Sequence, residues 1–195
     1  MAGAYARGPE ATGVRAAVKH FPGLGRVRAD THHFAARLDP PLATLEASDR
    51  RPFRDVLANS RAALMVGHVG LTALDPDRPA SHAKAVLEGL IRRQWNYQGV
   101  IITDDLVMGA IYGGDVCQAV VEALNGGADL LLVAYDGAQL YRVFGCARRA
   151  LARGELDLAM LRASEARLRR WSGEGGRSHR DRIPSAWPVR VPIAP

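Results

Sequence analysis

The sequence has few cysteines and no long apolar run, and each shortage excludes a class of protein. Only two of its 195 residues are Cys, so we predict two buried thiols rather than the disulfide framework of a small secreted domain. No apolar run approaches the roughly 20 residues that a membrane-spanning helix needs. The opening residues MAGAYARGPEATG lack the apolar core and cleavage site of a secretory signal. We therefore expect a cytoplasmic chain without membrane contact, although export of a longer form stays open.

The numbers of basic and acidic side chains are clearly unequal at only one end of the chain, the C-terminal end. The 26 Lys and Arg residues exceed the 20 Asp and Glu residues, an excess that ordinarily suggests a nucleic-acid or membrane partner. Residues 1–166, however, hold 19 basic and 18 acidic side chains. From residue 172 onward the text is rich in Gly, Ser, Pro and Arg without any hydrophobic period, which predicts a disordered tail over 172–195. We expect no nucleic-acid partner for the body of the chain, and binding through the tail is the least favoured alternative.

What the sequence does contain is a set of four short apolar runs that alternate with helical patterns. Near-continuous hydrophobicity, rather than alternation, is typical of parallel strands covered on both faces. Helical periodicity lies between and after the runs, so the chain is expected to be an α/β protein built from βα units. The predicted strands are 14–18, 62–66, 100–103 and 130–133, and the predicted helices are 52–60, 83–94, 115–125, 139–153 and 157–170.

Polar residues follow each predicted strand. They are Lys19 and His20, Gly67 and His68, Asp104 and Asp105, and the segment 134–136. Because the carboxyl ends of parallel strands meet at one edge of a sheet, and ligands bind at that edge in α/β folds, we expect a site there. A polar residue can also simply mark the end of a strand. The expectation of a site therefore rests on polar residues after all four strands rather than after any one of them.

Two carboxylate groupings could perform chemistry. Asp30 precedes His32 by two residues, and a hydrogen bond between them would fix the imidazole tautomer and raise its basicity, although a turn beside an exposed His is the commoner arrangement. Asp104 and Asp105 must point in different directions, so at most one faces the strand ends as nucleophile, base or metal ligand. Asp105 also suits a helix cap.

Several common site patterns are missing. The Cys and His residues lack zinc spacing and the carboxylates form no calcium loop, so we expect no metal. The sequence has no phosphate-binding loop, no nucleophile elbow and no dinucleotide fingerprint, so no cofactor is expected either. Hydrolase chemistry by carboxylate and imidazole is the interpretation that remains.

Three strings in order resemble glycoside hydrolase family 3, and more closely its bacterial β-N-acetylhexosaminidase branch. They are KHFPGLGRVRADTHH, AALMVGHVGL followed by Asp75 and Pro79-Ala80-Ser81, and GVIITDDLVMGAI with NGGADLLLV behind it. The resemblance runs from about residue 3 to Arg170. It implies part of a (β/α) barrel of the TIM type, with about four βα units in a domain at 1–171.

The resemblance also implies roles for particular residues. Asp104 would be the catalytic nucleophile, and His32 would be the acid/base, oriented by Asp30. The residues that would hold the sugar are Lys19, His20 and, on weaker grounds, His68. His33 lies outside the family pattern, Thr31 stands where the branch usually has Ser, and Leu24 stands where the family loop usually has a second His.

The implied activity is that of a retaining glycoside hydrolase, which removes terminal β-linked N-acetylglucosamine from peptidoglycan or chitin fragments through a glycosyl-enzyme intermediate. The alternatives are a phosphorylase or a β-glucosidase of the same family, or a non-catalytic sugar-binding remnant. Family members have eight strands and four are predicted here. We therefore expect a missing N-terminal half or a partner chain to complete the barrel, and little or no activity of the isolated chain.

Overall fold

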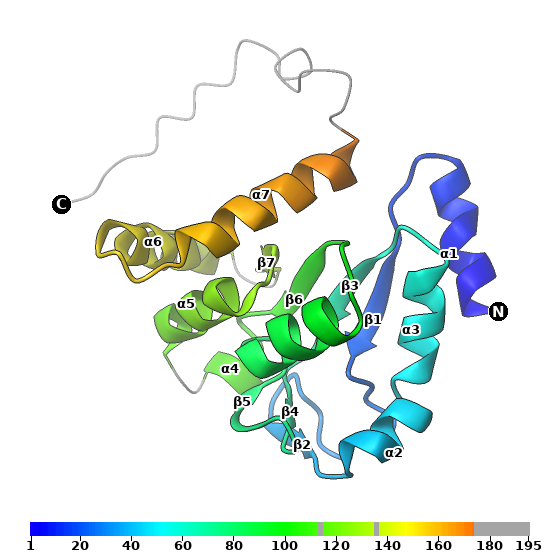
Figure 1. Ribbon diagram of the computed structural model, residues 1–195. Coiled ribbons are helices and arrows are strands. Elements are labelled where there is room, and N and C mark those ends of the chain that lie inside the picture. Colours follow the sequence, from blue (N-terminus) through cyan, green and yellow to red (C-terminus); the bar gives the residue numbers. More distant parts are fainter. Residues whose placement is uncertain (113–114, 135–136, 174–195) are drawn as a thin grey trace.

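The computed structural model describes residues 1–112, 115–134 and 137–173, and its centre is a parallel sheet (Figure 1). The strands are β1 (Ala17–Phe21), β3 (Ala63–Val66), β6 (Ile101–Asp105) and β7 (Leu130–Leu132), in the order β1-β3-β6-β7. Every neighbouring pair runs parallel. The α/β class and the four predicted βα units are thereby confirmed.

Helices flank this sheet on both sides. In Figure 1, α1 (Ala2–Ala11) and α3 (Arg51–Ala58) lie beside β1, whereas α5 (Val116–Gly126) and α6 (Gly137–Ala152) lie beyond β7. Helix α7 (Leu158–Ser172) crosses near the amino ends of the strands. The remaining helices are α2 (Leu42–Ala47), α4 (Gly109–Tyr112) and the π-type helix η1 (Ala85–Gln94).

Capping residues explain why the later helices begin within one or two residues of their predicted starts. The Asp115 carboxylate accepts a hydrogen bond from the Cys117 amide at 2.8 Å. Asp157 accepts from the Ala159 and Met160 amides at 2.9 and 3.2 Å. These bonds satisfy amides that have no partner inside the helix. Helix α5 ends at Gly126, and the next residue, Gly127, has a φ of 106°, a conformation that glycine adopts at low cost.

A second, smaller sheet lies at the carboxyl end of the first. It consists of β2 (Ala36–Leu38), β4 (Val69–Leu71) and β5 (Asp75–Pro79), with β2 parallel and β5 antiparallel to β4. Only two residues, Gly67 and His68, separate β3 from β4. The small sheet therefore closes over the edge where the strand ends converge (Figure 1). The sequence analysis did not predict it.

The main core packs around one aromatic residue on β1. Phe21 is fully buried and meets the rings of Phe53 and Trp95 edge to face, at centroid distances of 5.6 and 5.3 Å. Leu64 and Ile101, on the two central strands, are also fully buried in this cluster. Met65 and Ile102, neighbours on the same two strands, are only partly buried, so the two faces of the sheet are not equally covered.

Three predictions about local structure are wrong in detail. The first strand begins at Ala17 rather than Val14, which is exposed, so Lys19 and His20 lie within β1 instead of after it.

The two cysteines are not free thiols, because Cys117 on α5 and Cys146 on α6 form a disulfide. The tail predicted from residue 172 begins too early, since Ser172 is the last residue of α7. The rest of that tail, residues 174–195, lies outside the described residues.

A search of the described helices for membrane spans found none that is both long enough and apolar enough.

Candidate active site

Asp104 lies at the carboxyl end of β6, in the middle of the sheet. Its Oδ1 accepts a hydrogen bond from the Asp105 amide at 2.9 Å, and its Oδ2 lies 3.9 Å from Nε2 of His20. The Asp104 side chain is 14% exposed and that of His20 is 29% exposed. The carboxylate is therefore held in one orientation, and a small solvent-facing area remains through which a substrate can reach it.

His20 is partly enclosed beside this carboxylate. Burial lowers the pKa of its imidazole, and the positive charge of Lys19 and the charge of His32 lower it too, while Asp104 raises it. A neutral imidazole can both donate and accept, which suits a sugar hydroxyl. Lys19, on the same strand, is exposed. The geometry thus brings His20 to Asp104 and leaves Lys19 at the surface.

Asp105 points away from Asp104. Its Oδ1 accepts from the Val107 amide and from the Ala134 amide, both at 3.2 Å. The expectation that only one of the two carboxylates faces the strand ends is confirmed. The expectation that Asp105 caps the following helix is wrong, because α4 begins only at Gly109 and Asp105 instead ties the end of β6 to the segment after β7.

Asp30 and His32 form a hydrogen-bonded pair on the loop between β1 and β2. The Asp30 Oδ1 lies 2.7 Å from Nδ1 of His32 and also accepts from the His32 amide at 2.9 Å. These two bonds hold the pKa of Asp30 below its usual range. The pair is well exposed, at 59% and 72% for the two side chains. With Nδ1 bonded to Asp30, Nε2 of His32 is the nitrogen left for a substrate.

One backbone contact anchors this loop beside Asp104. The Gly109 amide donates to the His32 carbonyl at 2.7 Å. Gly109 lies five residues after Asp104, at the start of α4. A side chain there would meet the carbonyl oxygens of His32 and His33 at 2.8 Å, so the close approach requires glycine. The loop that carries the Asp30–His32 pair is thus docked onto the segment that follows the candidate nucleophile.

His68 lies beneath the site rather than in its opening. Its Nε2 is 2.8 Å from the Asp105 carbonyl and its Nδ1 is 2.7 Å from the Ser81 hydroxyl. Ser81 continues the chain to Nδ1 of His82 at 2.8 Å. Direct contact of His68 with a sugar stays a prediction. Ser81 stands in one of the family strings but has no role predicted from the sequence, and neither has His82. Polar residues between the buried Ala80 and Ala83 were the available signal.

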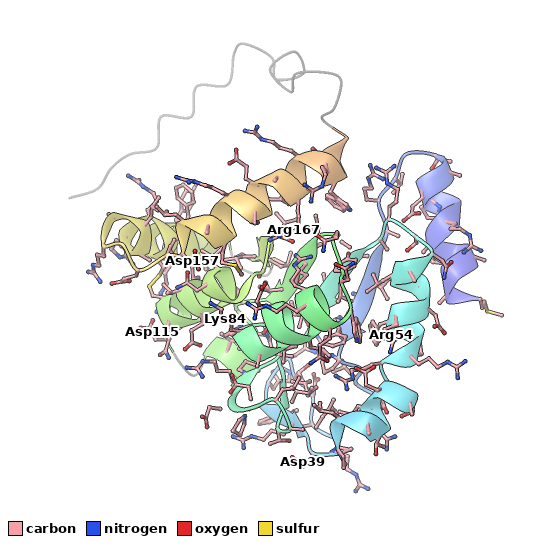
Figure 2. All side chains as sticks on the ribbon, viewed as in Figure 1. Asp39, Arg54, Lys84, Asp115, Asp157 and Arg167 are labelled. Atoms are coloured by element: carbon pink, nitrogen blue, oxygen red, sulfur yellow. A yellow bond between two sulfur atoms is a disulfide. The ribbon has the colours of Figure 1, made fainter. Side chains whose placement is uncertain are left out.

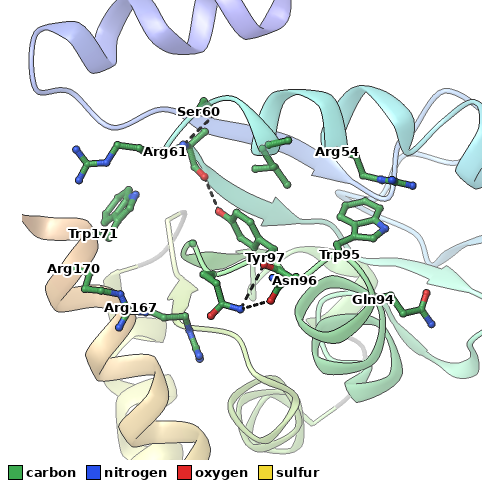
Figure 3. Close-up of a pocket in the computed structure, with 15 residues that line it drawn as sticks. Arg54, Ser60, Arg61, Gln94, Trp95, Asn96, Tyr97, Arg167, Arg170 and Trp171 are labelled. Carbon is green, nitrogen blue, oxygen red and sulfur yellow. Dashed lines mark hydrogen bonds between the residues drawn. The ribbon is translucent and has the colours of Figure 1, made fainter.

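Two further features bear on the location of the site. A cavity of about 530 Å³ lies at the opposite end of the sheet, near Ala62 and Gly99, which precede β3 and β6 (Figure 3). It is lined by Arg61, Arg170 and Trp171 among others, and by no acid or histidine of the described residues. Within the same described ranges, no three His, Cys, Asp or Glu side chains are grouped to hold a metal. Residues 135–136, part of the predicted strand-end cluster, lie outside the described residues.

Comparison with known proteins shows the family of this chain. The profile of the glycosyl hydrolase family 3 N terminal domain matches residues 1–171. A beta-hexosaminidase of Tolumonas auensis is 38% identical over 140 residues, which are 71% of this chain and 42% of that protein. A beta-hexosaminidase of Pseudomonas aeruginosa is 36% identical over 180 residues, which are 90% of this chain and 49% of that protein. The chain thus spans about half the length of these curated relatives.

Solved structures show the same fold. A family 3 β-N-acetylglucosaminidase from a Paenibacillus species superposes with a TM-score of 0.83 and 31% identity, covering 90% of this chain and 35% of that one. A family 3 glycosyl hydrolase from Mycobacterium smegmatis superposes with a TM-score of 0.77 and 36% identity, covering 90% and 53%. The fold is that of part of the α/β domain of glycoside hydrolases. The chain belongs to glycosyl hydrolase family 3, within its N-terminal domain.

Proposed function

We propose that this chain carries the nucleophile and the acid/base of a retaining β-N-acetylhexosaminidase. The observation that carries the proposal is the placement of Asp104 at the sheet edge with the Asp30–His32 pair on a loop docked five residues after it. A retaining glycosidase needs one carboxylate to attack the sugar and a second group to protonate the leaving oxygen. The names of the relatives support N-acetylglucosamine as the sugar.

In the first step, an Asp104 oxygen attacks the anomeric carbon while the bond from that carbon to the leaving oxygen breaks. The protonated His32 gives its Nε2 proton to that oxygen. Its Nδ1 keeps its own proton and continues to donate a hydrogen bond to Asp30. The product of this step is a glycosyl ester of Asp104 and a free alcohol. Histidine is the side chain that most often donates and accepts protons in catalysis.

In the second step, neutral His32 takes a proton from water, and the water oxygen attacks the anomeric carbon. The bond between that carbon and Asp104 breaks, so the carboxylate is restored and the sugar leaves with its configuration retained. His20, 3.9 Å from Asp104, is placed to bond a hydroxyl of the same sugar. Peptidoglycan or chitin fragments are the proposed substrates, and no cofactor takes part.

Turnover by the isolated chain is expected to be weak. The four-stranded sheet has β1 and β7 at its two edges, and sheet edges offer unpaired backbone groups. We propose that a further segment or a partner chain completes the barrel around these edges and supplies more of the sugar contacts. A cytoplasmic location stays part of the proposal.

The test is hydrolysis of 4-nitrophenyl N-acetyl-β-D-glucosaminide by the purified chain. Low but measurable release of nitrophenol is expected, and the Asp104→Asn variant should lose it. Asp105→Asn is the matched control, because an amide oxygen can still accept from the Val107 and Ala134 amides and Asp105 does not face the sugar. Equal release by the wild type and Asp104→Asn would refute the proposal.

Parallel reactions separate the alternatives. A glycosyl phosphate as product when inorganic phosphate is present would identify a phosphorylase. Faster release from the matching β-glucoside would identify a β-glucosidase. Sugar binding that survives Asp104→Asn, without turnover by the wild type, would identify a non-catalytic binding remnant.

A further inference from the structure

A buried chain of polar groups runs behind the end of β6 and ends at the segment that carries Asp104. It links four groups in order: the Asp105 carbonyl, the His68 imidazole, the Ser81 hydroxyl and the His82 imidazole. The three distances are 2.8, 2.7 and 2.8 Å. His68 is 2% exposed, Ser81 is fully buried and His82 is 4% exposed. All three side chains are thus almost entirely enclosed by the protein.

The carbonyl at one end fixes the direction of every hydrogen bond in the chain. A carbonyl only accepts, so Nε2 of His68 must carry a proton and donate to it. Neutral His68 then accepts at Nδ1 from the Ser81 hydroxyl, and the Ser81 oxygen accepts from Nδ1–H of His82. Nε2 of His82 is left without a proton and, among the described residues, without a partner. Burial lowers the pKa of both imidazoles, which keeps them neutral at pH 7.

Asp105 connects this chain to the candidate nucleophile. Its carbonyl accepts from His68, and its amide donates to Oδ1 of Asp104 at 2.9 Å. The backbone of Asp105 is therefore held from behind while it holds the Asp104 carboxylate in front. Displacing the carbonyl by a few tenths of an ångström would also tilt the amide that orients Asp104.

We propose that Ser81 and His82 are positioning residues for Asp104, which act through His68 and the backbone of Asp105. This assignment rests on the proposed role of Asp104 as nucleophile. This assignment explains why polar groups are present in this part of the interior. Buried polar groups without partners lower the stability of the fold, so a polar network there needs a functional reason. The assignment also gives His68 a role in supporting Asp104, in addition to the sugar contact predicted for it.

The first test is nitrogen-15 NMR of the histidine rings at pH 7. The wild-type chain should show His68 protonated at Nε2 and His82 protonated at Nδ1, both neutral. His82 protonated at Nε2 instead, or either ring charged, would overturn the proposal, because the bond directions above would be wrong.

The second test uses Ser81→Ala, with Ser164→Ala on α7 as the matched control for loss of a buried serine hydroxyl. Ser81→Ala should lose the Nδ1–H form of His82 and speed hydrogen exchange of the Asp105 amide at least tenfold. Ser164→Ala should change neither. Ser81→Thr retains the hydroxyl and should restore slow exchange. Unchanged Asp105 exchange in a folded Ser81→Ala protein would overturn the proposal.

Kinetics separate this proposal from the proposed function. Ser81→Ala should lower kcat for the nitrophenyl glycoside about tenfold and leave KM nearly unchanged, because the sugar contacts persist while the nucleophile is misaligned. If the wild type shows no turnover that depends on Asp104, the proposed function fails and the exchange experiment still decides the positioning role. If turnover depends on Asp104 but is equal in Ser81→Ala and Ser164→Ala, the positioning role fails alone.

Discussion

At the scale of single residues, the hydrogen-bonded pair of Asp30 and His32 orients one imidazole that could serve first as the acid and then as the base. The carboxylate accepts from the ring Nδ1 and from the His32 amide, so one small turn sets both the tautomer and the direction of the imidazole. A pair built by residues two apart needs no other part of the fold to form. The spacing therefore allowed the contact to be considered from the sequence, although a turn beside an exposed His was the commoner arrangement there.

The first prediction concerns removal of the Asp30 charge. Asp30→Asn should lower the rate for a 4-methylumbelliferyl N-acetylglucosaminide by about 100-fold, within the range that general acid–base catalysis contributes. Hydrolysis of the 2,4-dinitrophenyl analogue should be much less affected in its first step, because that leaving group departs without a proton. Equal losses with both substrates in pre-steady-state kinetics would contradict the acid role of His32.

The same pair sets an expectation for acid pH. Because hydrogen bonds from the His32 amide and ring hold the pKa of Asp30 below its usual range, the Asp30 carboxyl group should titrate at a lower pH in the folded chain than in the unfolded chain. A carbon-13 NMR titration measures this, and titration of Asp30 in its ordinary range would contradict the hydrogen bonds.

Residue-level prediction from the sequence failed where partners lie far apart in the chain. The buried apolar run placed both Asp104 and Asp105 at the strand end, and the family resemblance then singled out Asp104. The bond from His68 to the Asp105 carbonyl spans 37 positions, and no local pattern encodes it. The role of Ser81 and His82 followed only once the end of β3, the start of η1 and the end of β6 were placed together.

At the scale of elements, the contact between the His32 loop and α4 depends on one glycine. Gly109→Ala would place a methyl group 2.8 Å from two backbone oxygens of the loop, so either the loop or α4 must move. We predict a loss of at least tenfold in turnover with a small change in melting temperature. Gly8→Ala in α1 is the control, since nothing lies within 4 Å of the added carbon. A normal rate in Gly109→Ala would show that loop docking is unimportant.

The amino ends of the strands are joined by a buried ion cluster. Asp129, just before β7, bonds Arg92 of η1 at 2.6 Å and Arg167 of α7 at 2.8 Å, and it accepts from the Ile101 amide at 2.8 Å. Figure 2 shows Arg167 on α7, and this bond directs it toward the sheet. One carboxylate therefore fixes two helices and two strands relative to one another.

Removing that carboxylate should be costly. Asp129→Ala leaves two largely buried guanidinium groups unpaired, and we expect the free energy of unfolding to fall by about 3–5 kcal/mol. Asp55→Ala is the comparison, because its pair with Arg51 is exposed and 3.8 Å long, and such pairs contribute about 0–1 kcal/mol. Urea unfolding of both variants measures the difference. Similar small losses would show that the cluster is not a tie between the elements.

Element boundaries were predicted best where a capping residue marks them, as at Asp115 and Asp157. They were predicted worst at β1, where the apolar residue Val14 precedes the strand and is exposed. The small sheet was missed because β2 and β4 have three residues each, too few for a periodic pattern. Their pairing comes from the tertiary fold.

At the scale of the whole molecule, pH should affect stability through the buried His82. Burial and the charge of His68 lower the pKa of His82 to about 4, whereas in the unfolded chain it is near 6.5. Between these two pH values the unfolded state therefore binds more protons than the folded state. The contribution of His82 to the free energy of unfolding is present in full above pH 6.5 and is lost as the pH falls toward 4. The difference corresponds to about 3 kcal/mol.

This prediction is measured by urea unfolding at pH 7 and pH 4. The His82→Gln variant has no imidazole at this position, so its free energy of unfolding should fall by about 3 kcal/mol less between the two pH values than that of the wild type. Identical falls would mean that His82 is not buried in its neutral form.

The disulfide between α5 and α6 was not predicted from the composition, which suggested two buried thiols. Two cysteines in 195 residues gave no reason to pair them, since Cys117 and Cys146 are 29 positions apart. The side-by-side packing of the two helices brings them together. The α/β class and the family, in contrast, could be predicted because ordered motifs extend over most of the chain.

The central claim is that Asp104 becomes bonded to the sugar. The most direct measurement is incubation of the chain with a 5-fluoro glycosyl fluoride of N-acetylglucosamine, which forms the glycosyl-enzyme faster than water can hydrolyse it, followed by peptide mass spectrometry. The account predicts one glycosyl adduct on Asp104 in the wild type and none in Asp104→Asn. An adduct on another residue, or no adduct on the wild type, would contradict it.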